Sequence, residues 1–331
     1  MSKSIYNAAI IGCGNIAGGY DSKVKDSFTW THAKAYKNNP RFNLMAAFDV
    51  DVAKTKRFCE EWQVPNACSS VEELLRHKPE ALSICSPNDT HYPLMMKALE
   101  QEGLRAIICE KPLALSLKQA EEMQNACTAN DIILAVNYFR RWDENLAALG
   151  GEIKNKKYGN FLSGRVVYTK GVFHNASHAI NLLSSWFGSV AAISVNRKVL
   201  LDDGDFLADF SLQFSKGTSI EFRFWDYKNF NFFDIDLMSD QARIHLPMGN
   251  SIEIQMKQKS LMVAGEFSLG EIQSREQTVG YAISNLLQNL ADVLDGKSKK
   301  LKMEIFDAVE SVRLCEEIKT QRVNPAFCAS S

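Results

Sequence analysis

The sequence lacks several features that would define its class at once. No cysteine pair is spaced as CxxC, and the eight cysteines are scattered singly through 331 residues. No apolar run approaches the roughly 20 residues that a membrane helix requires. The apolar part of the N-terminus runs straight into a glycine turn, without the cleavage site of a signal peptide. A formal charge of −1 also argues against nucleic acid or an anionic membrane as the main partner.

What remains is the composition of an ordinary soluble globular protein. Hydrophobic residues make up 46% of the chain and charged residues 23%. Cys13, Cys85 and Cys109 stand inside apolar, strand-like runs, where a reduced thiol acts as a small hydrophobe. We therefore expect a reducing, cytoplasmic location. The length exceeds what one core usually supports, and no internal repeat is present, so two domains are expected.

The first 140 residues alternate short apolar runs with helical patterns. The apolar runs cover residues 5–12, 42–49, 81–86, 105–110 and 131–138. Between them lie segments such as 116–130, where Ser116 can cap a helix and Leu117, Ala120, Met123 and Cys127 form a stripe. Strands buried on both faces and alternating with helices predict an α/β domain with a doubly wound parallel sheet over residues 1–140.

From about residue 160 the pattern changes to strands of period two joined by short turns. These strands are expected over 161–169, 191–199, 206–214, 218–225, 232–238, 242–247 and 251–257. One helix, closed by Gly188, is expected over 171–188, and two more near 283–294 and 307–318. Residues 141–331 therefore predict an α+β domain with a large, mostly antiparallel sheet. The aromatic run 222–233 predicts sheet core and subunit interface, with sugar stacking by Trp225 or Tyr227 as an alternative.

A glycine motif follows the first predicted strand. IIGCGNIA places Gly12, Gly14 and Ala17 as GxGxxA, with Asn15 and Ile16 between them. The first glycine permits a tight turn, and the second lets backbone approach a pyrophosphate. The small third residue lets the next helix pack closely. The motif alone is weak, but its place after a buried N-terminal strand predicts dinucleotide binding.

Asp49 ends the second predicted strand. A carboxylate there accepts hydrogen bonds from ribose hydroxyls and repels a 2′-phosphate, so NAD is favoured over NADP. The spacing from Gly14 is longer than usual, which predicts an insertion over about residues 19–31. The alternative is that Asp49 only caps the next helix. His32, where the helix after the insertion should resume, has two open roles, substrate contact and capping.

The ends of the next two predicted strands are rich in polar residues. SICSPNDTH contains Ser86, Pro87, Asn88 and His91, and IICEKP contains Glu110 and Lys111. In a doubly wound sheet the carboxyl ends of the strands form the ligand crevice. These residues are therefore expected near the cofactor, with His91 orienting backbone rather than transferring protons.

GVFHNASHAINLL carries two histidines four residues apart, which places His174 and His178 on one face of a helix. A zinc protease would need HExxH, and Asn175 cannot act as its general base. No third metal ligand is evident nearby, so no metal is expected. Two histidines without chemistry remain an alternative.

Together, GxGxxA, Asp49, SPNDTH, EKP and a later helix with a central histidine resemble the GFO/IDH/MocA family of sugar and polyol oxidoreductases. The resemblance runs from residue 5 to about 320. It implies a Rossmann domain followed by an open-faced sheet domain that commonly forms a homodimer or homotetramer. It also implies a proline in EKP that is often cis, with Lys111 and His178 moving a proton while hydride passes to nicotinamide. In NYFRRWDEN, Arg140 and Arg141 are both candidates to face the substrate.

One departure from the family pattern concerns His174. Many members carry an aspartate at this place, four residues before the catalytic histidine. Three explanations stay open: His174 takes over part of that role, Lys111 and His178 act alone, or the substrate differs.

The sequence thus predicts an NAD-dependent oxidoreductase acting on a carbohydrate-type substrate. Its catalytic residues would be Lys111, His178 and His174, and its substrate residues Arg140, Arg141, Asn175 and His178. NAD would be held by Gly12, Gly14, Asn15, Ile16, Asp49, Ser86, Pro87, Asn88, His91, Glu110 and Lys111. Two alternatives are a glycoside hydrolase that retains NAD and a regulatory protein that senses NAD(H).

Overall fold

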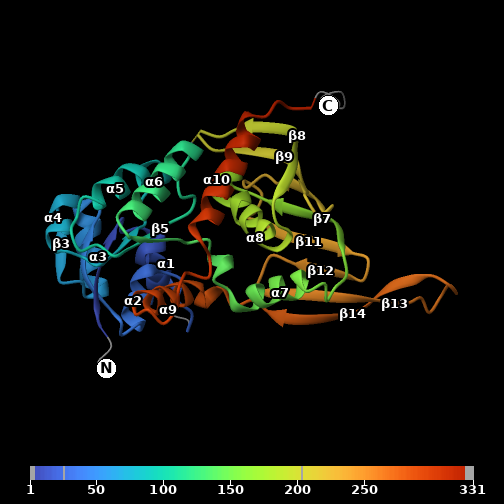
Figure 1. Ribbon diagram of the computed structural model, residues 1–331, viewed down its shortest axis with the longest axis horizontal. Coiled ribbons are helices and arrows are strands. Elements are labelled where there is room, and N and C mark those ends of the chain that lie inside the picture. Colours follow the sequence, from blue (N-terminus) through green and yellow to red (C-terminus); the bar gives the residue numbers. More distant parts are fainter. Residues whose placement is uncertain (1–3, 25–26, 203, 325–331) are drawn as a thin grey trace. The chain divides into compact units, whose positions relative to one another are not determined.

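The fold is described from a computed structural model, which describes residues 4–24, 27–202 and 204–324. The chain forms two compact units (Figure 1). The first comprises the residues up to Trp142 together with Val279–Val312, and the second comprises Asp143–Thr278 and the residues from Arg313 onward. The return over Val279–Val312 lies outside the predicted 1–140 domain.

The first unit is built on a parallel sheet, six-stranded among the described residues, with the order β3-β2-β1-β4-β5-β6. We call it the first sheet. All its strand pairs are parallel. The strands are β1 (Tyr6–Ile11), β2 (Phe42–Phe48), β3 (Asn66–Cys68), β4 (Ala81–Ile84), β5 (Ala106–Cys109) and β6 (Ile133–Val136). The strand order reverses between β1 and β4, so a ligand crevice is expected at the carboxyl ends of these strands.

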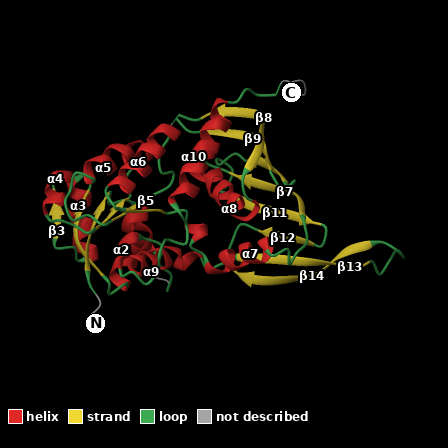
Figure 2. Cartoon of the chain, in the orientation of Figure 1, coloured by secondary structure: helices red, strands yellow, loops and turns green. Residues whose placement is uncertain are grey.

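Helices cover both faces of the first sheet (Figure 2), which explains why every residue of β4 and β5 is buried. The α-helices are α1 (Tyr20–Lys23), α2 (His32–Asn38), α3 (Val52–Trp62), α4 (Val71–Arg76), α5 (His91–Ala98), α6 (Leu117–Ala129) and α9 (Ala282–Leu294). Ser116 caps α6 as predicted, and Ala120, Met123 and Cys127 are its buried stripe. The apolar stripe of α9 joins the core of this unit, so the returning segment completes it.

The second unit contains a sheet of eight strands among the described residues, in the order β14-β13-β12-β11-β7-β10-β9-β8. We call it the second sheet. Its pairs are antiparallel except for β7 with β10. The strands are β7 (Phe161–Tyr168), β8 (Val190–Leu200), β9 (Phe206–Phe214), β10 (Ser219–Phe224), β11 (Phe233–Ser239), β12 (Ala242–Leu246), β13 (Ser251–Lys259) and β14 (Phe267–Glu276).

One face of the second sheet is apolar and is covered by helices. Phe210 and Phe222 are opposite each other on β9 and β10, and their rings stack at 4.3 Å between centroids. The covering helices are α7 (Glu144–Lys154), α8 (Ser177–Phe187) and the C-terminal part of α10 (Ile305–Thr320). Helix α8 ends at Gly188 with a φ of +90°, as predicted. The predicted α/β class with two such sheets is confirmed.

The opposite face of the second sheet carries charged side chains in ion pairs. Arg243 on β12 forms a bidentate pair with Asp236 on β11, at 2.9 and 3.0 Å. His245 lies between Asp234 and Glu253, at 2.8 and 3.1 Å. Strand β14 was not predicted, and most of its side chains are exposed on both faces. Together with β13 it forms a hairpin that extends beyond the rest of this sheet (Figure 1).

Candidate functional site

The glycine turn after β1 brings two loops into backbone contact. Gly12 has a φ of +89°, and a Cβ there would lie 2.7 Å from the carbonyl carbon of Cys85 and 2.8 Å from the nitrogen of Ser86. Glycine is therefore required for the loops after β1 and β4 to meet. At Gly14 the nearest atom to a Cβ would be Lys54 Nζ at 3.9 Å, so the backbone is accessible to a ligand. This arrangement fits a phosphate group of a dinucleotide.

The helix after the turn is broken into pieces. Asn15–Gly19 forms a π-turn that continues into α1, and the helix resumes only at His32. Asn15 is exposed, Ile16 is half-buried and Ala17 is fully buried, as the packing role of the small third residue requires. The predicted insertion over 19–31 thus contains α1 and separates the π-turn from α2. Lys25 and Asp26 of that insertion lie outside the described residues.

Asp49, at the end of β2, connects the glycine turn to the loop that follows β2. Its Oδ2 accepts the backbone N–H of Cys13 at 2.8 Å, and its Oδ1 accepts that of Asp51 at 3.0 Å. Lys54 Nζ lies 3.1 Å from Oδ2. Burial raises the pKa of Asp49, but these hydrogen bonds and the Lys54 charge outweigh it and lower the pKa below its usual value. Asp51, not Asp49, caps α3, so the alternative helix-cap role of Asp49 is wrong.

The loops after β4 and β5 are joined through His91. Its ring lies 2.9 Å from the carbonyl oxygen of Pro112 and 3.0 Å from that of Ser86. These are the contacts of a residue that orients backbone, the role expected for it. Pro87 is exposed, and Asn88 begins the short 3₁₀ turn Asn88–Thr90. The Lys111–Pro112 peptide bond is cis.

Glu110 and Lys111 form the corner at the end of β5. Lys111 is half-buried, and Glu110 is held from two sides. Glu110 Oε1 lies 3.0 Å from His32 Nε2 and accepts a hydrogen bond from Asn137 Nδ2 at 2.7 Å. His32 is fully buried, and Thr31 caps α2, so the capping role left open for His32 is wrong.

The two arginines after β6 differ in their contacts. Arg141 forms an ion pair with Asp307 at 2.9 Å, whereas the guanidinium of Arg140 lies 4.6 Å from the ring centre of Phe139. Both arginines are half-buried, in the 3₁₀ turn Phe139–Arg141. Asp307 thus engages Arg141 within this unit.

The segment with the two histidines is not one regular helix. Val172–Ala176 forms a π-turn, in which the N–H of Ala176 reaches the carbonyl of Gly171, and α8 begins only at Ser177. His174 is exposed, Asn175 is half-buried and His178 is buried. The wider turn explains why residues four apart differ so strongly here. Lys111 belongs to the first unit and His178 to the second.

Asp205 is a residue of this segment that the sequence analysis missed. Its carboxylate accepts the backbone N–H groups of Phe173 at 3.1 Å and His174 at 2.9 Å. Gly171, with a φ of +105°, leaves the space that Asp205 occupies, because a Cβ there would lie 2.3 Å from its Oδ2. No local pattern connects residues 171 and 205, so only the fold could reveal this contact.

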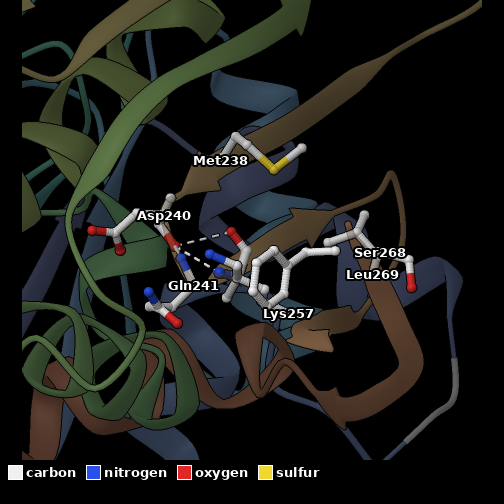
Figure 3. A pocket seen from close by; sticks show the side chains of 9 residues that line it. Met238, Asp240, Gln241, Lys257, Ser268 and Leu269 are labelled. Carbon is white, nitrogen blue, oxygen red and sulfur yellow. Dashed lines mark hydrogen bonds between the residues drawn. The ribbon is translucent and has the colours of Figure 1, made fainter. Parts of the chain in front are cut away.

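The second unit carries two further surface features. Trp225 and Tyr227 are exposed, and Trp225 stacks on Phe230. A shallow depression on the second sheet is lined by Met238–Ala242, Lys257 and Phe267–Leu269 (Figure 3). It contains none of the predicted site residues. Within the described ranges, no group of three or more His, Cys, Asp or Glu is placed to hold a metal ion, and no helix is long and apolar enough to cross a bilayer.

The fold and the glycine turn define a Rossmann-type unit followed by a second sheet unit. Residues 6–138 match the family model described as "Oxidoreductase family, NAD-binding Rossmann fold", GFO_IDH_MocA. The match covers the part of the chain whose motifs resemble this family.

Two relatives and one solved structure are similar to this chain. A D-glucoside 3-dehydrogenase of Escherichia coli K12 is 30% identical over 165 residues, which are 48% of this chain and 42% of that protein. A myo-inositol 2-dehydrogenase of Thermotoga maritima is 28% identical over 39% of this chain and 38% of that protein. The chain thus spans about two-fifths of the length of these relatives. An Agrobacterium radiobacter oxidoreductase solved with NAD⁺, L-tartaric acid and magnesium shares the fold, with a TM-score of 0.74, 17% identity, and coverage of 99% of this chain and 98% of that one.

Proposed function

We propose that the protein is an oxidoreductase that uses NAD to transfer a hydride to or from a hydroxyl or ketone carbon of a sugar, polyol or sugar nucleotide. The observation that carries this proposal is the Glu110–Lys111 corner at the end of β5. It belongs to a sheet whose other strand ends carry the glycine turn and Asp49. The names of the relatives, which act on a glucoside and on inositol, support a substrate rich in hydroxyl groups.

The dinucleotide would be held by the glycine turn, by Asp49 and by the ends of β4 and β5. Gly14 would let the pyrophosphate approach the backbone, and Asp49 would accept the hydroxyls of the adenosine ribose. When bound, the nicotinamide supplies the hydride acceptor or donor. Lys54 is the cation beside Asp49, so the preference for NAD depends on the Asp49 charge outweighing that of Lys54.

Lys111 would hold or take the proton of the reacting hydroxyl. A lysine near a cationic nicotinamide has its ammonium form destabilised, which brings its pKa toward the working pH. His178 would be its partner in proton transfer, with His174 and Asn175 as substrate-facing modifiers. Arg140 or Arg141 would bind a substrate oxygen. Such acid–base groups typically contribute about 10²- to 10⁴-fold in rate.

The test is a panel of polyols, sugars and sugar nucleotides with purified protein and NAD⁺, followed by NADH absorbance. Lys111→Met should lower kcat by at least about 100-fold. Lys118→Met is the matched control, since Lys118 is an exposed lysine on α6 that only pairs with Glu122. No absorbance change with any substrate, together with a Lys111→Met protein that keeps its biological role, would discard the dehydrogenase in favour of a regulatory protein. Sugar release without net NADH would favour the hydrolase that retains NAD.

The cofactor preference has a separate test. NADH and NADPH binding to the wild type, Asp49→Ala and Lys54→Met are compared by fluorescence titration. We expect the wild type to prefer NADH, Asp49→Ala to lose that preference and Lys54→Met to strengthen it. A wild type that prefers NADPH would overturn the assignment of NAD.

We also propose that the protein works in the cytoplasm as a homodimer or homotetramer. The seven cysteines that the structure describes are free and buried, as in a reducing compartment. The second sheet would form the contact between copies. Light scattering of the purified protein tests this, and a monomer at micromolar concentration would contradict it.

A further inference from the structure

A chain of buried polar side chains extends from α2 to the end of β5. Tyr36 Oη lies 2.8 Å from Ser83 Oγ, and Ser83 Oγ lies 3.0 Å from His32 Nδ1. His32 Nε2 lies 3.0 Å from Glu110 Oε1. Tyr36, Ser83 and His32 are buried and do not belong to the predicted site. Burying such a chain costs free energy unless each polar group has a hydrogen-bond partner. A chain of this kind therefore indicates a role beyond packing.

The hydrogen atoms of this chain can be assigned in one consistent direction. Burial raises the pKa of Glu110, but His32, Asn137 and Lys111 outweigh it and lower the pKa, so Glu110 is an ionised acceptor. His32 Nε2 therefore carries the hydrogen that Glu110 accepts. Burial raises the pKa of Tyr36, which stays a phenol and donates to Ser83. Ser83 then donates to His32 Nδ1, and a neutral His32 satisfies every partner.

The two hydrogen bonds to Glu110 end on the same oxygen. His32 and Asn137 both contact Oε1, and among the described residues no hydrogen bond reaches Oε2. Glu110 is 8% exposed, so its side chain is not sealed from the crevice. His32 in α2 and Asn137 just after β6 thus fix the rotation of the carboxylate. They leave its other oxygen, Oε2, to a ligand.

The position of Glu110 indicates which part of a dinucleotide would meet that oxygen. A dinucleotide lies across the point where the strand order reverses, with one mononucleotide half on each side. Gly14 and Asp49 follow β1 and β2, on the adenosine side. Glu110 ends β5, on the other side, where the nicotinamide riboside would lie.

We propose that His32 is a positioning residue of the dinucleotide site, which holds Glu110 so that Oε2 accepts a hydroxyl of the nicotinamide riboside. The inference rests on the proposed function in taking this edge of the first sheet as the NAD site. His32 acts through Glu110 and touches no ligand itself. Ser83 and Tyr36 keep His32 in the tautomer that donates to Glu110.

The test is a double-mutant cycle on NADH binding, with ADP as the second probe. His32→Leu removes the donor, Glu110→Gln removes the charge, and a third variant carries both changes. We expect each single variant to weaken NADH binding about tenfold, the effect of losing one hydrogen bond to a charged group. The double variant should bind no more weakly than Glu110→Gln alone, because His32 acts only through Glu110. ADP lacks the nicotinamide riboside, so its affinity should stay unchanged in all three variants.

A fourth variant and a stability measurement separate positioning from packing. His32→Gln places an amide nitrogen near the position of Nε2, and it should recover most of the NADH affinity that His32→Leu loses. If His32→Leu lowers the melting temperature but leaves NADH affinity unchanged, or lowers NADH and ADP affinity equally, His32 is only structural and the inference is wrong. A wild type that binds neither NADH nor NADPH would overturn the proposed function, and this inference with it.

Discussion

The two sheets use polar residues in opposite ways. The first sheet is apolar throughout β4 and β5 except at Ser83, and its polar groups gather at the carboxyl ends of the strands. The second sheet carries ion pairs on one face, over β11, β12 and β13. Because helices cover both faces of the first sheet, a polar group there must be fully paired, whereas water can solvate the second sheet's charges. Polar residues thus lie at the carboxyl ends of the strands in the first sheet, whereas in the second sheet they lie along the strands on one face.

The largest expected difference is in the loss of unfolding free energy when neighbouring residues of one strand are replaced by alanine. Ile107→Ala and Ile108→Ala on β5 should each lower the free energy of unfolding by about 2–5 kcal/mol, because both side chains are fully buried. On β11, Leu237→Ala should cost as much, whereas Met238→Ala should cost less than about 1 kcal/mol, since Met238 is 41% exposed. Urea denaturation measures all four. Equal costs for Leu237 and Met238 would contradict a one-sided second sheet.

A smaller effect is expected from one hydroxyl in each sheet. Ser83→Ala on β4 should cost about 1–3 kcal/mol of unfolding free energy, because Tyr36 and His32 both lose a buried partner. Ser163→Ala on β7 is the matched control and should change stability by less than about 0.5 kcal/mol, since Ser163 is exposed. Equal losses of unfolding free energy for the two substitutions, measured by denaturant titration, would contradict this difference between the sheets.

Acid should weaken the second unit through Glu152. This carboxylate accepts hydrogen bonds from Arg275, Lys157 and Tyr158. Burial raises its pKa, but these contacts outweigh it and lower the pKa from 4.5 to about 2. Since the unfolded chain binds the proton more readily, stability is present above pH 4.5 and is lost as the pH falls toward 2. The melting temperature of Glu152→Gln should therefore fall less steeply than that of the wild type as the pH decreases from 4.5 to about 2.

The control for that measurement is Glu271→Gln on the exposed strand β14, where Glu271 has no ion pair among the described contacts. It should follow the wild-type profile. A Glu152→Gln protein that loses stability with acid as steeply as the wild type would assign the effect to other groups.

The smallest effect is expected on the charged face. Arg243→Met should cost no more than about 1 kcal/mol, because the pair with Asp236 is partly exposed to water. The cost should shrink in about 1 M salt, where the screening length is about 3 Å. The cost of Ser83→Ala should not respond to salt. Denaturation at low and high salt measures both, and a salt-independent Arg243→Met would indicate that this face is dry.

Five strands of the first sheet were predicted because burial on both faces leaves continuous apolar runs. The short strand β3 was missed. The turns at Gly12 and Gly188 could also be read locally. Strand β14 was missed because exposure of both its faces leaves no alternation to detect. The π-turn before His178 was missed because a spacing of four fits a regular helix equally well.

The candidate site was only partly visible for a related reason. Strand ends can be located from apolar runs, so Asp49, Glu110 and Lys111 could be named. His32 was noticed, but its partners lie 51 and 78 residues away, and no local pattern encodes such distances. The role of Asp205 could not be predicted for the same reason, since its carboxylate contacts Phe173 and His174 only in the folded chain.

The return of Val279–Val312 to the first unit has a consequence for synthesis of the protein. Domains generally fold in order as they leave the ribosome, at about 5–20 residues per second. Here the core of the first unit needs Leu286, Leu287 and Leu290 from α9. That core therefore stays incomplete until α9 has been translated. A gene fragment that stops at residue 142 should yield an unfinished, chaperone-dependent product, although it contains the whole first sheet.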